Sequence, residues 1–287
     1  MDLVTAIGIG AAGVAAGAIN AIAGGGSLLT FPVLLAAGLP SVSANVTNTV
    51  GIVPGTIGGS IGYRAELRGQ GRRVVRLGVP GLLGGVIGGV VLLVTPTSVF
   101  DAVVPVLVAG ACFLLLSQPR LARRIQVRRD GRAPRSRAGP QDAAANDPAA
   151  DPANDPAANP ASDPAADGGG AALWTGVLFV GMYAGYFGAA AGVMFLALFG
   201  LLLDDTLQRA NALKGVLAGL INAVAAVLFA AFGPVEWAAA VALGVGTIVG
   251  GRVGAAIAQR IPDRPLRLGV AFGGLVIAAL LAYRAAS

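Results

Sequence analysis

Glycines and neutral polar residues, rather than acids, bases or thiols, are the groups in this sequence that could act on a solute. The chain has no histidine and a single cysteine, Cys112. It therefore lacks the usual general base, the Ser-His triads and the common zinc sites. Acidic residues lie only near the ends of the apolar segments, so a proton relay or sodium cage has no obvious carrier. We expect no catalytic residue, no metal site and no cofactor.

Three consecutive glycines, Gly24, Gly25 and Gly26, interrupt an apolar stretch where a helix would otherwise continue. At membrane depth, non-helical backbone is tolerated only if it is buried in protein or lines a water-filled cavity. Ser27 follows directly and can cap the next helix, whose first N–H groups carry the positive end of the helix dipole. Such a helix start favours an anion. The glycines therefore predict a cavity with an anion site.

A similar break occurs at "YFGAAAGVMF", where Gly188 and Gly192 flank small residues and a second helix start is expected at Val193. The alternative is that glycines only allow close helix packing, because small residues at four-residue spacing are common in membrane bundles. We favour the site interpretation for Gly24 to Gly26. We favour the packing interpretation for six later glycines: Gly84, Gly85, Gly88, Gly250, Gly251 and Gly254.

Neutral polar side chains also occur in the apolar segments, among them Asn45, Thr47, Asn48, Asn211 and Asn222. In lipid such groups face the protein interior, where they either bridge helices or line a path. Bridging is the commoner use, but we select these five as candidate lining residues.

Two cations lie within apolar segments, Arg252 and the chain's only lysine, Lys214. Each could attract an anion into a cavity. Each could instead extend its charge to the membrane interface, with the stem in the apolar region. The sequence leaves both interpretations open.

The composition requires a bilayer. Of the 287 residues, 55% are hydrophobic and 12% charged, and the mean hydropathy is +0.77. The N-terminal segment has no basic region before it, so we expect it to be retained rather than cleaved. Most arginines lie beside apolar segments and act as topology signals, which argues against nucleic acid as a partner. The expected apolar segments are 3–23, 27–38, 43–63, 76–95, 99–117, 173–190, 193–203, 210–232, 237–258 and 266–284.

Residues 118–170 separate two membrane parts, 1–117 and 171–287. Eight arginines lie in residues 118–137, and a Pro/Ala/Asp-rich stretch without basic residues follows. Such low-complexity sequence has nothing to bury, so disorder is the expectation for the second half of this linker.

The two membrane parts share a pattern at a constant offset of 166 residues. This offset pairs Ala44-Asn45 with Ala210-Asn211 and Gly26 with Gly192, and it also pairs several glycines after residue 77. One ungapped offset suggests two copies of one unit.

The loop charges of the two copies are reversed. Residues 64–76 are rich in arginine, whereas their counterpart "AFGPVEWAAA" has none; "TPTSVF" has none, whereas its counterpart "RIPDRPLR" is rich in it. Because arginine marks the cytoplasmic side, the copies have opposite orientations and the linker is cytoplasmic. Inverted repeats are typical of secondary transporters, whose substrate lies at the repeat interface.

Inversion requires an odd number of crossings in each copy. Five crossings fit this requirement if the short segment 27–38 crosses, although its helix of about 18 Å is too short to cross alone. Three fits if the first two segments form a re-entrant hairpin. Both counts remain open.

The run "GGGSLLTFPVLLAAGLPSVSANVTNTVGIVPGTIGGSIGYRAEL" resembles the first-half signature of the sulfite exporter TauE/SafE family of membrane permeases. In the second half, "ANALKGVLAGLINAVAAVLFAAFGPVEW" and "GTIVGGRVGAAIAQRIP" are similar to that family's segments. The resemblance covers the chain apart from 118–170. Two features depart from it, namely the break "GAAAG" in place of a glycine run, and the long acidic linker.

This resemblance implies a cytoplasmic-membrane exporter of small sulfur-containing anions such as sulfite or sulfonates. The positions that carry over are Gly24, Gly25, Gly26, Pro32, Asn45, Thr47, Asn48, Gly192, Lys214 and Asn222. The expected protein is an all-α polytopic membrane transporter of two inverted repeats, with broken or re-entrant helices at the glycine breaks. It would move its anion by alternating access. A channel is the rival within transport, and a membrane-embedded scaffold or enzyme is the rival outside it.

Overall fold

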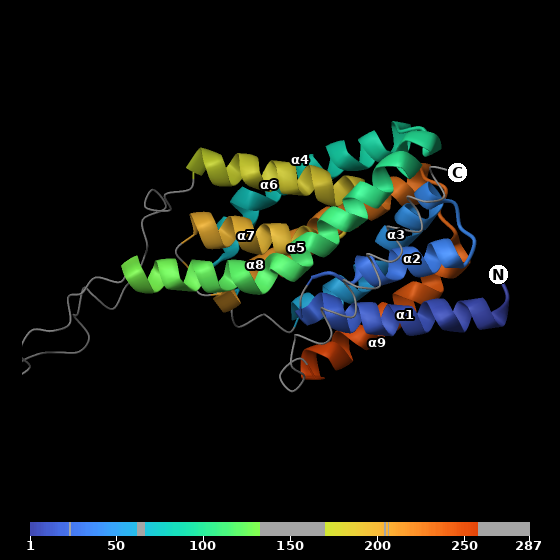
Figure 1. The fold of residues 1–287 in the computed structure, drawn as a ribbon, viewed down its shortest axis with the longest axis horizontal. Helices are drawn as coiled ribbons and strands as arrows, with labels where there is room; N and C mark the ends of the chain where they lie inside the picture. Colours follow the sequence, from blue (N-terminus) through green and yellow to red (C-terminus); the bar gives the residue numbers. More distant parts are fainter. Residues whose placement is uncertain (23, 62–66, 133–169, 204, 206, 258–287) are drawn as a thin grey trace, which may run out of the picture.

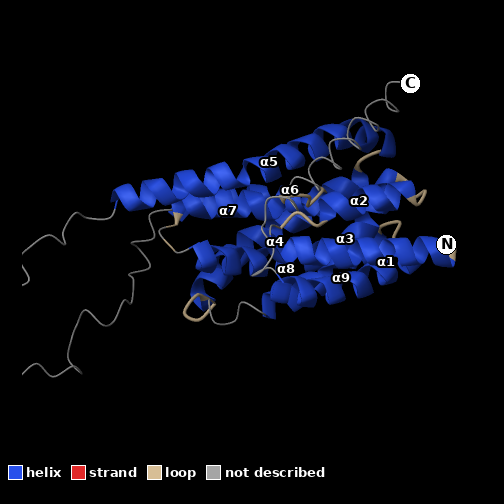
Figure 2. Cartoon of the chain, turned by 60° about the horizontal axis from the view of Figure 1, so that its bottom comes forward, coloured by secondary structure: helices blue, strands red, loops and turns tan. Residues whose placement is uncertain are grey.

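The computed structural model describes residues 1–22, 24–61, 67–132, 170–203, 205 and 207–257. Over these residues the chain is helical and contains no strand (Figure 2). Four of the described helices contain a stretch long and apolar enough to cross a membrane, at Leu3–Asn20, Gly71–Val94, Thr97–Ser117 and Arg209–Phe232. The expected class, a helical membrane protein, is confirmed. The helices are α1 (Leu3–Ile22), α2 (Ser27–Ala36), α3 (Ser41–Ile61), α4 (Gly71–Val94), α5 (Thr97–Arg132), α6 (Gly170–Tyr186), α7 (Ala191–Leu202), α8 (Leu207–Phe232) and α9 (Trp237–Ile257).

Helices α1, α3 and α9 run side by side in the same direction (Figure 1). A Cβ atom on Gly13 of α1 would lie 3.2 Å from the Cα of Gly246, and one on Gly17 would lie 2.8 Å from the backbone N of Gly251. On α3, a Cβ atom on Gly55 would likewise lie too close to Thr247 of α9. Small residues let these backbones approach closely, as in other membrane bundles.

Helices α4, α6 and α8 form a second parallel set. A Cβ on Gly84 would lie 2.8 Å from the backbone N of Met182, and one on Gly88 would lie 2.8 Å from that of Tyr186. The packing interpretation is therefore confirmed for Gly84 and Gly88. It holds also for Gly85, Gly250 and Gly251, each of which faces a neighbouring helix. The contacts of Gly254 lie outside the described residues.

Helices α1 and α2 form a hairpin. Because α1 and α3 begin at the same end of the bundle, α2 must return to that end, and its 10 residues span only about 15 Å. Such a return belongs to both predicted arrangements, so the number of crossings in each copy stays a prediction. Helices α6 and α7 form another hairpin in the second parallel set. That set runs opposite to the first, because α4 begins at the end where α3 finishes.

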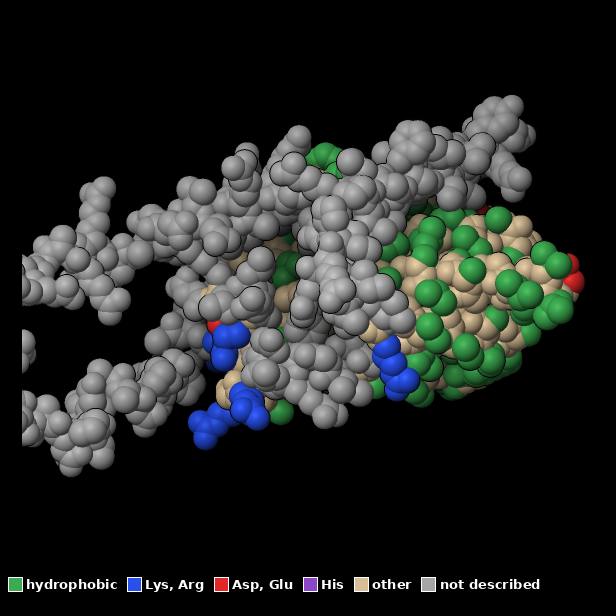
Figure 3. Space-filling view, turned by 90° about the horizontal axis from the view of Figure 1, so that it is seen from below, with side chains coloured by type: hydrophobic (Ala, Val, Ile, Leu, Met, Phe, Trp, Pro, Cys, Tyr) green, Lys and Arg blue, Asp and Glu red, His purple; other side chains and the backbone are tan. Residues whose placement is uncertain are grey.

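The two ends of the bundle differ in charge (Figure 3). We name the end that carries Asp2, Asp101 and Glu236 the acidic end. There Ser41 donates a hydrogen bond to Asp101 and Ser43 donates one to the Pro234 carbonyl, which brings the loops before α3, α5 and α9 together.

We name the opposite end, which carries Arg68, Arg72, Arg73 and Arg209, the arginine end. Asp205 forms ion pairs there with Arg73 at 2.7 Å and with Arg209 at 3.0 Å. These loops lie together as the charge pattern predicts, whereas "RIPDRPLR" lies outside the described residues. Helix α5 continues to Arg132, so the first residues of the predicted linker are helical, while 133–169 are not described.

Candidate functional site

The two glycine breaks meet inside the bundle. A Cβ on Gly24 would lie 3.3 Å from the Cα of Gly192, and a Cβ on Gly192 would lie 3.2 Å from the Cα of Gly24 and 3.3 Å from its carbonyl oxygen. Helix α2 begins at Ser27 as expected, and α7 begins at Ala191, two residues before the predicted Val193. Two helix starts that are 166 residues apart in sequence therefore lie at one place.

Both breaks contain a residue in the left-handed backbone conformation. Gly24 has φ +77°, and Ala190, its partner at the 166-residue offset, has φ +59°. Ala190 is the one non-glycine residue with positive φ in the described part of the chain. This conformation costs an ordinary residue about 1–2 kcal/mol, so the fold imposes it there. The break "GAAAG" thus keeps the backbone feature of the glycine run despite its different composition.

The capping role expected of Ser27 is not found. Gly26 occupies the cap position with helical angles, φ −57° and ψ −35°, and no side chain caps the helix. A capping side chain must belong to a residue with non-helical angles just before the helix. Ser27 is already the first helical residue.

A cavity of about 70 Å³ surrounds the meeting point of the breaks. On the same measure one water molecule needs about 10–15 Å³, so the cavity can hold several waters or one small solute. Its lining residues come from α1, α3, α8 and the two breaks: Gly17, Asn20, Gly24, Ser27, Ile52, Gly55, Thr56, Gly188, Ala191, Gly192, Asn211, Lys214, Gly215, Ala218 and Asn222.

Lys214 lies between the breaks. Its Nζ is 3.6 Å from the Cβ position of Gly24, and its Cδ is 3.5 Å from that of Gly192. The side chain lines the cavity and is only 5% exposed, which is the geometry of the cavity interpretation and not of a charge at the membrane interface. Arg252, in contrast, is exposed and absent from the cavity lining.

Three further candidates line the cavity as expected, namely Ser27, Asn211 and Asn222. The Oδ1 of Asn222 is 3.9 Å from the Cβ position of Gly188, so this amide reaches the second break. The lining also includes Asn20 and Thr56, which were not selected from the sequence. The offset could have found Thr56, because residue 56 pairs with Asn222.

Gly25 and Gly26 belong to the break but not to the cavity lining. Gly25 faces Leu115, whose Cδ1 lies 3.3 Å from its Cβ position, and a Cβ on Gly26 would lie 2.4 Å from the carbonyl oxygen of Ala16. Gly26 thus lets the α1–α2 hairpin fold tightly, and Gly25 lets α5 pack closely on the break. Only Gly24 of the three faces the second break.

Asn45, Thr47 and Asn48 also lie outside the cavity lining, because they occupy the half of α3 nearer the acidic end. Asn45 Nδ2 donates to the Tyr186 carbonyl at 2.9 Å, and Thr47 Oγ1 accepts from the Glu236 N–H at 2.9 Å. Asn48 Oδ1 accepts from Thr30 Oγ1 at 2.5 Å. All three bridge elements, which is the alternative use noted for such residues.

The cavity therefore combines one buried cation, neutral amides and hydroxyls, and two helix starts. None of its described lining residues is acidic. This set can receive the oxygens of a small anion, because lysine and asparagine side chains and helix N-termini all offer hydrogen-bond donors.

Comparison with known proteins agrees with this architecture. The family model described as sulfite exporter TauE/SafE matches residues 9–281. The chain belongs to the sulfite exporter TauE/SafE family. Among curated proteins of the same kind, the probable membrane transporter protein YfcA of Escherichia coli K12 is 27% identical over 93% of this chain and 86% of its own length. The probable membrane transporter protein ORF9 of a Sinorhizobium species is 24% identical over 85% of this chain and 79% of its own length. No solved structure matches the chain.

Membership in the TauE/SafE family confirms the resemblance noted in the sequence. With several helices apolar enough to span a bilayer, the chain is a multi-pass membrane protein whose relatives are probable transporters.

Proposed function

We propose that this protein transports a small sulfur-containing anion, such as sulfite or a sulfonate, out of the cell across the cytoplasmic membrane. The observation that carries the proposal is the meeting of Gly24 and Gly192 beside the buried ammonium group of Lys214. The anion lies in the cavity between the two helix starts. Asn211, Asn222 and Ser27 donate hydrogen bonds to its oxygens.

The proposed mechanism is alternating access by two inverted repeats. Its support is the reciprocal packing of the two halves. Helices α1 and α3 of the first half both pack on α9 of the second half. Their counterparts in the second half, α6 and α8, both pack on α4 of the first half. The two hairpins enter the bundle from opposite ends. Substrate at the interface of such repeats is typical of secondary transporters.

Export needs no coupling carboxylate. A membrane potential is worth about 2.3 kcal/mol per charge per 100 mV. At an inside-negative potential of about 100 mV, the equilibrium ratio of outside to inside concentration of a monovalent anion is therefore roughly fifty. The charge pattern supports a cytoplasmic location for the arginine end. The anion would then enter the cavity from that side.

The test is flux from liposomes that contain the purified protein, loaded in turn with sulfite, sulfoacetate, taurine or sulfate, at imposed potentials of both signs. We expect faster, saturable loss of a sulfur-containing anion relative to protein-free liposomes. No loss of any of these solutes at either potential would contradict the proposal and favour a scaffold without transport activity. A voltage-dependent rate that never saturates would instead favour a channel.

A further inference from the structure

A layer of aromatic side chains separates the cavity from the acidic end. Phe187 directly precedes the lining residue Gly188, and its ring centroid lies 5.4 Å from that of Phe31 on α2, edge to face. Phe100, at the start of α5, lies 6.4 Å from Phe187 and 5.8 Å from Tyr186. The three phenylalanine side chains are buried. The rings thus extend from the edge of the cavity to the acidic end.

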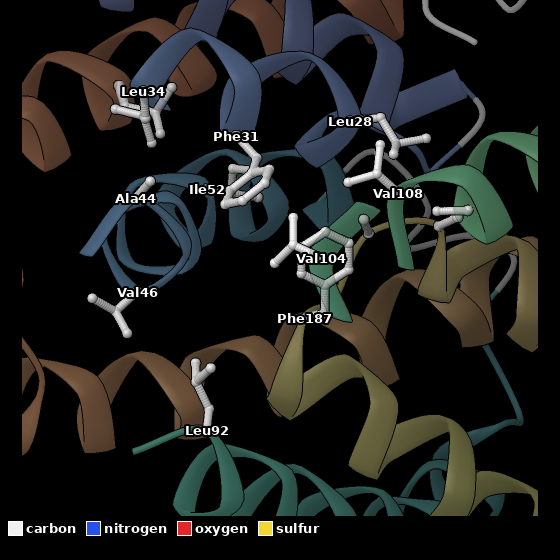
Figure 4. Close-up of a cluster of buried hydrophobic side chains, with 14 of the residues drawn as sticks. Leu28, Phe31, Leu34, Ala44, Val46, Ile52, Leu92, Val104, Val108 and Phe187 are labelled. Carbon is white, nitrogen blue, oxygen red and sulfur yellow. The ribbon is translucent and has the colours of Figure 1, made fainter. Parts of the chain in front are cut away.

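The neighbouring aliphatic side chains complete this layer. In Figure 4, Phe31 and Phe187 point toward one another from the first and second halves of the chain, with Val104 of α5 beside them. Val104 and Val108 are buried in the same cluster. An apolar layer of this kind has no group that could replace the water around an ion, so an anion in the cavity cannot pass it.

Hydrogen bonds fasten the two halves together around the aromatic layer. Asn45 binds the carbonyl of Tyr186, Thr47 binds the N–H of Glu236, and Ser43 binds the carbonyl of Pro234 at 2.7 Å. Each of these bonds joins α3 to an element of the second half. Asn45, Thr47 and Ser43, which do not line the cavity, therefore hold its side toward the acidic end closed.

The repeat does not place the same rings at the equivalent positions of the other half. At the 166-residue offset, Phe187 pairs with Ala21, Tyr186 with Asn20, and Phe31 with Ala197. Small residues thus replace two rings, and Asn20, the partner of Tyr186, lines the cavity. The two sides of the site differ in chemistry although the backbone repeats.

We propose that Phe31, Phe100, Tyr186 and Phe187, fastened by Asn45 and Thr47, form a gate that closes the cavity toward the acidic end, so that the site in this conformation is reached from the arginine end. This rests on the proposed alternating access. Opening of the gate requires the Phe31–Phe187 contact and the bonds between α3 and the second half to break together. The cavity would then face the acidic end.

Thiol labelling tests the gate without any transport assay. In a Cys112→Ser background, Ser27→Cys places a thiol in the cavity, and a membrane-impermeant, negatively charged methanethiosulfonate is added to intact cells or to inverted vesicles. Arg68→Cys and Ser98→Cys, both at exposed positions, report the arginine and acidic ends. Ser27→Cys should label with the sidedness of Arg68→Cys. Adding Phe187→Ala or Phe31→Ala should raise its labelling from the acidic end by at least about tenfold.

The matched control is Phe199→Ala, which removes a fully buried ring from the other hydrophobic cluster and should leave labelling one-sided. Size-exclusion chromatography identifies the variants that remain folded. Two gate variants are used, so that the test still holds if one of them does not fold. Labelling of Ser27→Cys from the acidic end before the gate is altered, no labelling from the arginine end, or one-sided labelling in both folded gate variants would each overturn the proposal. Because no substrate is involved, failure of the gate is distinct from failure to transport sulfur-containing anions.

Discussion

At the residue scale, the site depends on how few charged groups reach the cavity. The single lysine lies between two breaks whose backbones nearly touch, and the other polar residues that line the cavity in the described part of the chain are neutral. A buried ammonium group in a region of low dielectric interacts strongly with an anion, by about 4 kcal/mol at 4 Å if the effective dielectric constant is 20. Lys214 is therefore the residue most able to determine the sign of charge that the site accepts.

Removal of that charge should weaken substrate recognition selectively. We expect Lys214→Gln to reduce saturable anion flux into or out of liposomes by at least about tenfold, equivalent to about 1.4 kcal/mol or more of lost interaction. Arg252→Gln removes a cation that is exposed and does not line the cavity, so it should keep most of the flux. Equal losses in the two variants would mean that Lys214 acts only as one more positive charge of the membrane protein.

Much of the site could be predicted from residue types, but the direction of side chains could not. The glycine runs and Lys214 identified the cavity, because broken backbone in an apolar segment needs an interior to face. Asn45 and Asn211 are equivalent in the repeat, yet only Asn211 lines the cavity. Which of two equivalent residues faces the cavity depends on how the surrounding helices pack, and the residue type alone does not specify that packing.

At the scale of elements, close helix contacts explain most of the glycines beyond the breaks. A Cβ on Gly88 would lie 2.0 Å from the backbone carbonyl oxygen of Met182, whereas one on Gly78 of the same helix would meet nothing within 4 Å. The backbone carbonyl cannot move aside as a flexible side chain could. The contact between α4 and α6 therefore requires glycine at position 88.

This contrast predicts opposite effects of one methyl group. Gly88→Ala should destabilise the protein by about 1–3 kcal/mol, the usual cost of overpacking. Gly78→Ala should be neutral or slightly stabilising, because alanine favours helix over glycine by about 1 kcal/mol. Thermal unfolding of both variants in detergent measures the difference. A melting temperature for Gly88→Ala at or above that of Gly78→Ala would show that α4 and α6 are not packed as described.

The hairpins show what the sequence left undecided at this scale. The sequence did not specify that α1 and α3 run in the same direction with α2 returning between them. That direction results from the packing of α1 and α3 on α9, between residues more than 180 positions apart. Apolar periodicity within one segment carries no information about such a distant partner.

At the scale of the whole molecule, the charges of the two ends predict how the protein lies in the membrane. Arg68, Arg72, Arg73 and Arg209 lie at one end, where the Arg-containing extension of α5 also emerges (Figure 1). Positively charged segments stay in the cytoplasm during insertion. The offset in the sequence already predicted this reversal of loop charges, because charge composition, unlike side-chain direction, is read directly from the residues.

The orientation can be measured through the linker. We expect residue 150 to lie in the cytoplasm. A fluorescent protein inserted after it should therefore mature, whereas a phosphatase that is active only in the periplasm should remain inactive. We expect the linker to lie outside the membrane parts, so the insertion should leave anion flux unchanged. Phosphatase activity at this position would reverse the assigned orientation and with it the direction of transport.

The central claim is that the two breaks form the transport site where Gly24 and Gly192 meet. The most direct test is potential-driven efflux of sulfite from liposomes that contain wild-type protein, Gly192→Ala or Gly78→Ala. The Gly192→Ala methyl group would lie 3.2 Å from the Cα of Gly24, beside Lys214, whereas the Gly78→Ala methyl group meets open space. We predict saturable efflux from wild type and Gly78→Ala, and efflux near that of protein-free liposomes from folded Gly192→Ala. Wild-type efflux from Gly192→Ala would contradict the claim.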